Sequence, residues 1–523
     1  MLKKYITQKN TYADSITLMR LSSEIESAPG IFQATAVMST PANLEVAVAA
    51  ELIDKDFQAR PTDLLVAVCA ENEQAADDAL KMAQDRLNKS RSASAVAAES
   101  QNRHPKSLQM GVTEQNDLNF ALISCPGQFA AAEAEKALNL GLDTMIFSDN
   151  VSFADERRLK QIALEKDLFM MGPDCGSTIL SGVPLGFANV VNKGNIGLVA
   201  ASGTGLQQVT CLISQGGSGI SHALGTGGRD LSPEIGGISM IQGIKALAAD
   251  KMTEIIVIIS KPPSEDVARK VIETAENTGK PVIVCFLGSG KHSGDDNLHF
   301  AASLADAAEL ALKMSTAGYE TPAADNKSGT DLSPIRPGQK YIRGVYSGGT
   351  FCYEAQIILR ESLGNVWSPT PLDNESKLAS SDLSREHTVI DLGDDEFTRG
   401  RPHPMIDHRT RHERILQEAG DPTTALILFD LVLGYGAHPD PAAEMCTSIR
   451  SAREIAGRDN RDIIFVGFVC GTDQDPQNLR GQIQMLEQVN VIVEDHNAAA
   501  TRRAVSIVQA LQDARVGAPN GED

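Results

Sequence analysis

Short apolar runs alternate along this chain with longer, alanine-rich helical stretches and glycine-containing turns. Five of these runs have the length and composition of buried strands: FALISC (120–125), TMIFS (144–148), IGLVAAS (196–202), EIIVIIS (254–260) and KPVIVCFLG (280–288). Regular alternation of strands and helices is typical of parallel sheets that helices cover on both faces. The pattern therefore predicts an α/β fold.

Two polar segments interrupt this pattern. Residues 88–114 are rich in Ser and Ala and have no clear apolar period, but strands continue on both sides, so we interpret them as an excursion within an N-terminal domain. Residues 315–340 contain several prolines and glycines and no strand-like run, which is typical of a linker. The second segment is the stronger domain boundary.

An internal repeat spans this linker. IGLVAASGTGL (196–206) and IRGVYSGGTF (342–351) each predict a strand, then Ser-Gly with Thr, and then a helix. Four further pairs follow in the same order: GTGGRDL (225–231) and VIDLGDDEF (389–397), EIIVIIS and ALILFDL (425–431), KPVIVCFLG and RDIIFVGFVC (461–470), and alanine-rich helices near 301–314 and 497–512. The repeat predicts two similar α/β units that form a pseudo-twofold pair with a site between them.

The first pair of the repeat places a glycine-rich turn before a helix in both units. Glycines permit a tight turn, and the first amides of the helix stay free beside the positive end of its dipole. Such a turn can bind phosphate or carboxylate, although a single copy could equally be an ordinary N-cap. Because two copies occur, we predict a phosphate between the two helices. The predicted phosphate-binding residues are Ser202, Gly203, Thr204, Gly205, Ser347, Gly348, Gly349 and Thr350.

The length, composition and charge of the chain argue against several classes of function. A chain of 523 residues, 42% of them hydrophobic, suggests about three domains with buried cores. The formal net charge of −21 argues against nucleic acid as a partner. Neither a membrane-spanning run nor a secretory signal is evident, and the eight cysteines form no CxxC pair. We therefore expect a cytoplasmic protein with reduced cysteines, among which Cys175 is the one candidate for a reactive thiol.

Charged side chains after predicted strands are candidates for catalysis. Lys261 follows the strand EIIVIIS and precedes two prolines, so its ammonium should reach a ligand at the carboxyl edge of the sheet. We predict that Lys261 and Arg229 counter the charge of the phosphate and of the transition state. Asp230, beside Arg229, is a candidate for substrate binding. The alternative for Lys261 is a solvated lysine on a turn.

The second unit carries two further groups of candidates. A carboxylate cluster in VIDLGDDEF could bind a cation, orient a substrate amide, act as a base or simply be solvated. GRPHPMID (400–407) could hold a small carboxylate through Arg and offer His as acid or base, or it could be a proline-rich structural turn. The predicted residues are Asp391, Asp394, Arg401 and Asp407 for substrate binding and His403 for catalysis.

His408 and His412 have the i,i+4 spacing of some metal sites. The surrounding DHRTRHER is strongly basic, however, so we interpret it as a surface helix and predict no metal site.

Several segments resemble succinyl-CoA synthetases. The stretch NIGLVAASGTGL…GTGGRDLS (195–232) is similar to the α-chain of these enzymes, MGPDC (171–175) to their MGPNC motif, and the part from Tyr341 to the carboxyl-terminal ligase domain of their β-chain. Over nearly the whole chain, the sequence resembles the FdrA family. That resemblance rests on TPAN (40–43), FSDNVS (147–152), GVPLGFANV (182–190), GGRDLS (227–232), SKPP (260–263) and GRPHPMID.

The resemblance implies a domain organisation. A Rossmann-like, CoA-binding-type domain would span 1–190, with the polar excursion at 88–114. An α-chain-like ligase domain would span 191–314 and, after the linker 315–340, a β-chain-like ligase domain would span 341–515. Both ligase domains would be flavodoxin-like products of an internal duplication. CoA is then a candidate cofactor, and phosphate or carbamoyl phosphate a candidate substrate.

Departures from the synthetases bear on the chemistry. These enzymes carry a phosphohistidine in a GHAGA-type segment, where this chain has GKHSGDDNLHFAASLADAA (290–308), so neither His292 nor His299 has that context. Lys261 replaces a glutamate expected in a GEIGG-type strand end. No segment resembles an ATP-grasp domain, so we do not expect ATP-dependent CoA ligation by this chain alone.

The FdrA resemblance implies two activities. Some members are described as acyl-CoA synthetases, and the family includes a subunit of oxamate carbamoyltransferase, which phosphorolyses oxalurate to oxamate and carbamoyl phosphate. Since the phosphate loops remain while the phosphohistidine setting does not, we predict carbamoyl or acyl phosphate transfer. The expected partners are operon-encoded subunits in a hetero-oligomer, and a homodimer is a further expectation. Acyl-CoA synthesis with a separate ATP-binding subunit is the alternative, and a CoA-sensing or scaffolding subunit is a third.

Overall fold

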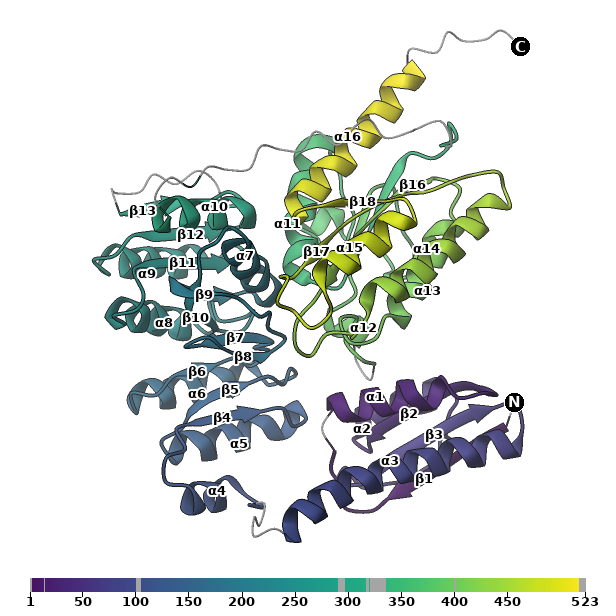
Figure 1. Ribbon diagram of the computed structural model, residues 1–523, viewed down its shortest axis with the longest axis horizontal. Helices are drawn as coiled ribbons and strands as arrows, with labels where there is room; N and C mark the ends of the chain where they lie inside the picture. Colours follow the sequence, from purple (N-terminus) through teal and green to yellow (C-terminus); the bar gives the residue numbers. More distant parts are fainter. Residues whose placement is uncertain are drawn as a thin grey trace. The chain divides into compact units, whose positions relative to one another are not determined.

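The computed structural model describes residues 2–13, 15–99, 105–289, 297–316, 319, 335–398 and 401–516. The chain divides into two compact units. The first comprises Met1–Leu142 with Asp395–Pro402, and the second comprises Asp143–Asp394 with His403–Asp523. Helices and strands alternate through both units, and the larger sheets are mainly parallel, so the predicted α/β fold is confirmed (Figure 1).

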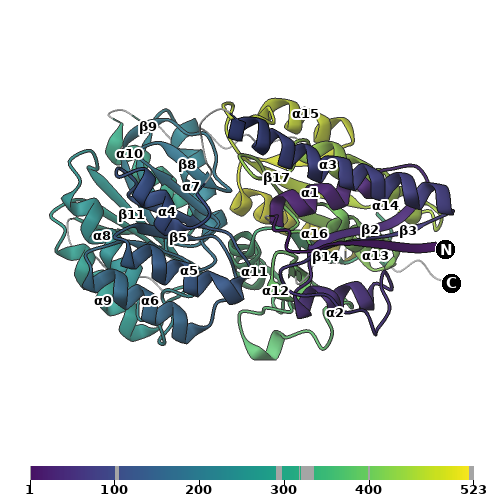
Figure 2. The same cartoon turned by 90° about the horizontal axis from the view of Figure 1, so that it is seen from below.

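The first unit opens with three strands and three helices. They are β1 (Leu2–Gln8), α1 (Ser15–Glu26), β2 (Ile31–Met38), α2 (Pro41–Ala49), β3 (Leu64–Ala70) and α3 (Glu73–Glu99). β3 lies between β1 and β2 and is antiparallel to both. Since alternate residues of β3 face opposite sides, α1 and α3 cover one face of the sheet and α2 the other (Figure 2).

This antiparallel sheet differs from the Rossmann-like arrangement predicted for residues 1–190. β1 and β2 run in the same direction and are connected through α1, as in a Rossmann unit, but β3 is inserted between them in the opposite direction. The alternation of apolar and polar residues is the same for a strand of either direction. The local pattern therefore could not distinguish the two sheets.

The predicted polar excursion at 88–114 is largely helical. Residues 88–99 continue α3, and 108–114 form α4 (Leu108–Glu114). Ala, Lys, Arg and Glu favour helices by propensity alone, so the absence of an apolar period did not indicate a loop. The unit continues with β4 (Phe120–Ile123) and α5 (Gly127–Asn139), and the short helix α12 (Asp395–Thr398) also belongs to it.

The second unit begins with β5 (Asp143–Ile146), α6 (Phe153–Glu165) and β6 (Met170–Met171). A seven-stranded sheet follows, in the order β13-β12-β11-β9-β10-β7-β8. Its elements are β7 (Ser177–Leu180), β8 (Val183–Gly186), β9 (Lys193–Ala201), α7 (Gly203–Gln215), β10 (Ile220–Gly225), α8 (Ile238–Ala249), β11 (Ile255–Ser260), α9 (Glu265–Glu276), β12 (Val282–Phe286), β13 (Leu298–Phe300) and α10 (Leu304–Ser315). β9 to β13 are parallel, and β7–β8 is an antiparallel hairpin at one edge.

Most of the predicted linker 315–340 lies outside the described residues. After it, a five-stranded parallel sheet has the order β15-β14-β16-β17-β18. Its elements are β14 (Tyr341–Tyr346), α11 (Gly349–Leu363), a 3₁₀ turn (Asn374–Ser376), β15 (Thr388–Asp391), α13 (Arg409–Gly420), β16 (Thr424–Val432), α14 (Pro441–Gly457), β17 (Ile464–Cys470), α15 (Leu479–Gln488), β18 (Val491–Glu494) and α16 (Asn497–Val516).

The two sheets of the second unit have one topology. Without its edge hairpin the first reads β10-β9-β11-β12-β13, which matches β15-β14-β16-β17-β18 strand for strand. This is the flavodoxin-like order 2-1-3-4-5. The predicted internal duplication is therefore confirmed, and we call the two halves the first copy (β9–α10) and the second copy (β14–α16).

The two copies share a core. Helices α7 and α11, which follow the first strand of each copy, pack against each other (Figure 1). One continuous apolar cluster includes Leu206 and Val209 of α7 together with Phe351 and Ala355 of α11. No helix in the described part of the chain combines the length and the apolar character that a membrane crossing requires.

Candidate functional site

The two glycine-rich turns meet at the starts of α7 and α11. The hydroxyls of Ser202 and Thr350 share a hydrogen bond of 2.7 Å. A Cβ added to Gly348 would lie 2.8 Å from Cγ2 of Thr204, so no larger residue fits between the turns. The structure thus brings together the two segments that we predicted to surround a phosphate. We call this place the α7–α11 junction.

The two turns are not equivalent. Ser202 caps α7, because its Oγ accepts the N–H of Gly205 at 3.0 Å. Among the described residues no side chain caps α11, which starts after Gly348. The first amides of α11 therefore keep their donor capacity and the positive end of the helix dipole. The anion-binding potential of the junction lies mainly with the second copy.

Ser347 is held away from α11 by a buried carboxylate that the sequence analysis missed. Asp430, near the end of β16, accepts the N–H and the Oγ–H of Ser347, both at 2.8 Å. Arg411 of α13 in turn donates to Oδ1 of Asp430 at 3.2 Å and to the carbonyl oxygen of Val345 at 3.3 Å. Asp430 and Arg411 are both buried. A charged residue within the otherwise apolar run ALILFDL was the signal that could have indicated this role.

Two predicted residues reach the first residue of α11 from different copies. Asp391 ends β15 and Lys261 directly follows β11. A Cβ added to Gly349 would lie 2.4 Å from Oδ2 of Asp391 and 3.8 Å from Nζ of Lys261. The Lys261 ammonium also lies 5.5 Å from the ring centroid of Tyr353, on the next turn of α11. A cation and a carboxyl thus flank the uncapped helix end.

The Asp391 carboxyl has an unusual environment. Burial raises its pKa to about 7, while the positive charge of Lys261 and the N–H of Gly393, which donates to Oδ1 at 2.9 Å, favour the charged form. The carboxylates of Asp394 and Asp430 act in the raising direction. Both protonation states of Asp391 are therefore populated near neutral pH.

His403 adjoins the same loop. Its Nδ1 accepts the N–H of Met405 at 3.2 Å, and its Nε2 lies 2.7 Å from where a Cβ on Gly393 would be. Burial, with a contribution from the charge of Arg411, lowers the pKa of His403 to about 4. The ring is therefore neutral at pH 7, and because Nδ1 is the acceptor, Nε2 carries the proton. It can donate a hydrogen bond toward the Asp391 loop.

The segment that follows the β7–β8 hairpin also contributes to this region. Phe187, within the motif GVPLGFANV, packs on the His403 ring with centroids 5.9 Å apart. Asn189 of the same motif donates to the carbonyl oxygen of Leu433 at 2.9 Å and to Asp475 at 2.8 Å. The motif therefore fixes the segment before β9 against the second copy.

Arg229 and Asp230 are engaged elsewhere. Asp230 is fully buried, accepts from Lys160 at 2.7 Å, and caps α8 by accepting the N–H of Met240 at 2.8 Å. Arg229 pairs with Glu156 of α6 at 3.0 Å. The structure uses these charges in ion pairs with α6, and it shows no contact of either with the junction among the described residues. The sequence around Arg229 and Asp230 is rich in glycine, like the two turns at the junction. This likeness is the reason why the sequence predicts a ligand site there.

The remaining predicted residues are placed differently. Asp394 is half-buried beside Asp391. Asp407 accepts the N–H of Arg409 at 2.9 Å and pairs with its guanidinium at 2.8 Å. Arg401 is exposed and belongs to the first unit. A structural turn, the alternative reading of GRPHPMID, thus describes Asp407 better than a free carboxylate does.

The helix predicted at DHRTRHER is present as the start of α13, with Arg409 and Glu413 exposed, but part of this segment is buried. His408 is buried against the ring of His438, with centroids 5.3 Å apart. Arg411 and Arg414 are buried because each has a carboxylate partner, Asp430 for the first and Glu418 for the second. Over the described residues, no group of three His, Cys, Asp or Glu side chains could hold a metal ion.

Cys175 and the two histidines of the phosphohistidine-like segment can also be placed. Cys175 is buried, and burial raises its pKa to about 11, which makes it a poor nucleophile. His299 lies half-buried in β13, and His292 lies outside the described residues.

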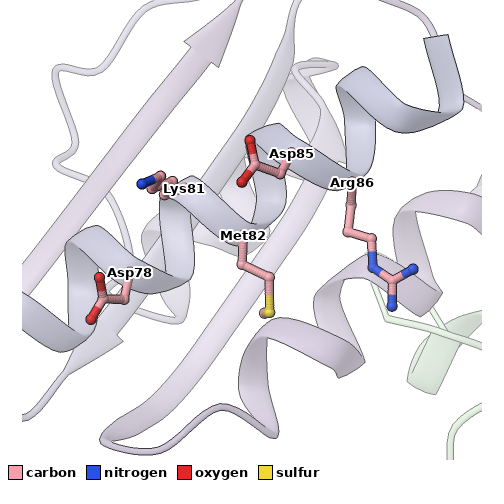
Figure 3. Close-up of a pocket in the computed structure, with 5 residues that line it drawn as sticks. All are labelled: Asp78, Lys81, Met82, Asp85 and Arg86. Atoms are coloured by element: carbon pink, nitrogen blue, oxygen red, sulfur yellow. The ribbon is translucent and has the colours of Figure 1, made fainter. Parts of the chain in front are cut away.

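The hollow drawn in Figure 3 lies in the first unit and has a volume of about 280 Å³. Its lining residues all belong to α3: Asp78, Lys81, Met82, Asp85 and Arg86. Charges of both signs alternate there, and Arg86 is paired with Glu24 at 3.0 Å. One exposed helix face with mixed charge offers no concentrated field for a substrate.

Comparison with known proteins identifies the relatives of this chain. It is 40% identical over 501 residues to the uncharacterized protein YahF of Escherichia coli (strain K12), covering 94% of this chain and 96% of that protein. The chain belongs to the YahF family. This YahF-family chain is also 26% identical over 227 residues to the α subunit of an ADP-forming succinate–CoA ligase of Staphylococcus epidermidis, covering 41% of the chain and 72% of that subunit. The family is thus succinyl-CoA-synthetase-like, as the resemblance implied.

Three family models match parts of the YahF-family chain. A CoA-ligase model matches 345–507, the second copy, and a CoA binding domain model matches 191–288, the first copy. This CoA binding domain match lies outside residues 1–190, for which the resemblance implies a CoA-binding-type domain. A model described as "AllF, heavy metal-associated domain" matches 1–105. An ATP citrate lyase from Methanothrix soehngenii is 12% identical with a TM-score of 0.34, covering 80% and 86% of the two chains, a likeness too low to carry a functional argument.

The residues of the first unit do not fit the heavy-metal name. Soft metal ions are bound by paired thiolates, yet Cys69 is the single cysteine of residues 1–105 and lies buried in β3. We therefore assign no metal to this unit.

Proposed function

We propose that this chain is an acyl-CoA-synthetase-like subunit that binds an acyl phosphate at the α7–α11 junction and transfers its acyl group to the thiol of CoA. The observation that carries the proposal is the meeting of the uncapped start of α11 with Lys261 and Asp391. The CoA-ligase and CoA binding domain models, which match the two copies that form the junction, support it.

Each group at the junction suits one part of this reaction. The free amides at the start of α11 suit the phosphate, which is both the recognised group and the leaving group. Lys261 suits the charge that grows on phosphate as its bond to the acyl carbon breaks. The Nε2–H of neutral His403 suits the carbonyl oxygen, which becomes more negative as the thiol attacks.

One part of the proposal concerns another chain. Formation of the acyl phosphate from ATP is assigned to a separate ATP-binding subunit, in a hetero-oligomer with this chain.

The sequence analysis ranked carbamoyl transfer first. None of the matches reported above names a carbamoyl-transferring protein, whereas two models and the succinate–CoA ligase name CoA. Acyl transfer to CoA is therefore the better-supported function, and phosphorolysis of oxalurate becomes an outcome of the test.

The half-reaction can be tested without the partner. Purified protein is incubated with CoA and either acetyl phosphate or succinyl phosphate, and thioester and inorganic phosphate are measured together. Thioester and phosphate in equal amounts are expected. Formation of carbamoyl phosphate from oxalurate and phosphate, with no thioester from any acyl phosphate, would replace the proposal by carbamoyl transfer. Binding of CoA without either product, even with the operon-encoded subunits, would favour a sensing or scaffolding subunit.

A further inference from the structure

Among the groups at the α7–α11 junction, one is placed to move the proton of the reaction. We propose that Asp391 is the general base that accepts the thiol proton during acyl transfer and returns it in the reverse direction. This inference rests on the proposed function, and it adds a catalytic residue that the phosphate site alone does not require.

The two carboxyl oxygens of Asp391 have different surroundings. Oδ1 accepts the N–H of Gly393 at 2.9 Å, which fixes the carboxyl group on its loop. Oδ2 faces the first residue of α11, since it lies 2.4 Å from where a Cβ on Gly349 would be. This oxygen is therefore held next to the helix end where the phosphate of the substrate is proposed to bind. Absence of a side chain at position 349 is what allows the approach.

Charged and titratable groups approach Asp391 from several elements. Lys261 approaches from β11, Asp394 from the same loop and Asp430 from β16. His403 faces Gly393, and its pKa of about 4 makes its imidazole a weak base. Burial raises the pKa of Asp391 to about 7, against the charge of Lys261. A base with a pKa near the working pH combines a useful ionised fraction with good proton affinity.

The step balances without a further reactant. The thiol sulfur forms a bond to the carbonyl carbon of the acyl phosphate as its proton moves to Oδ2 of Asp391. The bond between that carbon and the phosphate oxygen breaks, and its electron pair leaves with phosphate, next to Lys261 and the α11 amides. Asp391 then releases the proton to solvent. In the reverse direction protonated Asp391 delivers the proton to the departing thiolate.

The test compares Asp391→Asn with Asp382→Asn, a control at an exposed aspartate of the same copy. For the wild type, kcat for thioester formation should fall as the pH falls through about 7, because the base becomes protonated. Asp391→Asn should lower kcat by about 10²- to 10⁴-fold and remove this inflection, with KM for the acyl phosphate changed less than about twofold. Asp382→Asn should match the wild type in kcat and in the inflection of its pH profile. Wild-type kcat and inflection in a folded Asp391→Asn protein would overturn the role of Asp391 and leave the proposed function intact.

A second measurement separates this inference from the proposed function. Infrared difference spectra across the same pH range should show a carboxyl that titrates near 7 in the wild type and in Asp382→Asn, and not in Asp391→Asn. This readout needs no turnover, so it remains informative if no acyl phosphate is a substrate. Should Asp391→Asn fail to fold, Asp391→Glu keeps a carboxyl and should retain an inflection in its kcat profile. A folded, active Asp391→Glu protein without an inflection would contradict the proposal.

Discussion

At the scale of single residues, Gly349 and Gly203 of the junction differ in the space around them, although their neighbours in the sequence are similar. A Cβ on Gly349 would collide with Oδ2 of Asp391 at 2.4 Å, whereas a Cβ on Gly203 would meet only Oγ of Ser177 at 3.8 Å. SGTG and SGGT look alike, yet Gly349 has much tighter surroundings than Gly203. The two glycines should therefore respond differently to the same substitution.

We predict that Gly349→Ala abolishes the rise in melting temperature that phosphate gives, while Gly203→Ala retains most of it. The reason is that the added methyl group at 349 must displace Asp391 from the helix end. Gly457→Ala, where nothing lies within 4 Å of the added atom, is the control. Thermal unfolding with and without phosphate measures the effect. Equal phosphate protection in Gly349→Ala and wild type would remove the start of α11 from the binding site.

Lys261 supplies a second prediction at this scale. Lys261→Met keeps the apolar stem and removes the charge, so folding should survive because the residue is exposed. Turnover of acyl phosphate and CoA should fall about ten- to a hundredfold, since a charge-assisted contact contributes roughly 1.5–3 kcal/mol. Lys270→Met, on the exposed face of α9, serves as the control. Near wild-type turnover in Lys261→Met would leave this lysine as a solvated residue on a turn.

At the scale of elements, the second copy positions its glycine turn through β16 and α13. Asp430 replaces the small Ser260 that ends β11 in the first copy, and it binds Ser347 and Arg411. The cap residue of α7 is Ser202, whereas that of α11 is Gly348, and the serine before Gly348 is bound to Asp430. The helix that carries Arg411 looked exposed from its sequence, because the carboxylate that accommodates Arg411 is Asp430 of β16. Arg414, by contrast, pairs with Glu418 on the next turn of the same helix.

We predict that Arg411→Met destabilises the protein by about 3–5 kcal/mol, because it leaves Asp430 buried with fewer donors. Asp430→Asn should destabilise the protein less, since the amide oxygen of Asn can still accept a hydrogen bond from Ser347. Urea unfolding of the two variants beside the wild type checks the order. If Arg411→Met unfolds at the wild-type urea concentration, the buried pair does not stabilise the second copy.

At the scale of the whole molecule, two buried histidines of the second copy link stability to pH. Burial and the charge of Arg343 lower the pKa of His387 to about 4, and burial does the same for His403. In the unfolded chain both have a pKa of about 6.5. Between these values the unfolded state binds more protons, so stability falls as the pH decreases from about 6.5 toward 4.

Through His387 alone, the free energy of unfolding should decrease by up to about 3 kcal/mol at pH 4, since each pKa unit corresponds to about 1.4 kcal/mol. His387→Asn should lose less stability over that range, although it is less stable at pH 7 if the acceptor at Nδ1 for the N–H of Ile342 is lost. Chemical unfolding at pH 7 and pH 4.5 measures both. Equal slopes of stability against pH in variant and wild type would show that His387 does not titrate in this range.

The sequence alone determined the parts of this protein that local patterns encode. Buried strands, alanine-rich helices and the duplicated strand–glycine–helix unit follow from apolar periodicity and from the special conformational demands of glycine, and all three are present. The two turns that meet at the junction were recognisable for the same reason. The resemblance to succinyl-CoA synthetases added the family, which comparison with YahF and the succinate–CoA ligase supports.

Tertiary structure decided what depends on residues distant in the chain. The direction of β3 comes from its neighbours, and the pairing of Arg411 with Asp430 joins α13 to β16. Asp230 could be seen as a cap of α8 only once α6 supplied Lys160. Lys261 and Asp391, 130 positions apart, share a site because the carboxyl ends of two sheets converge on α11. Burial and charge at that point set the pKa of Asp391, and neither quantity can be read from neighbouring residues in the sequence.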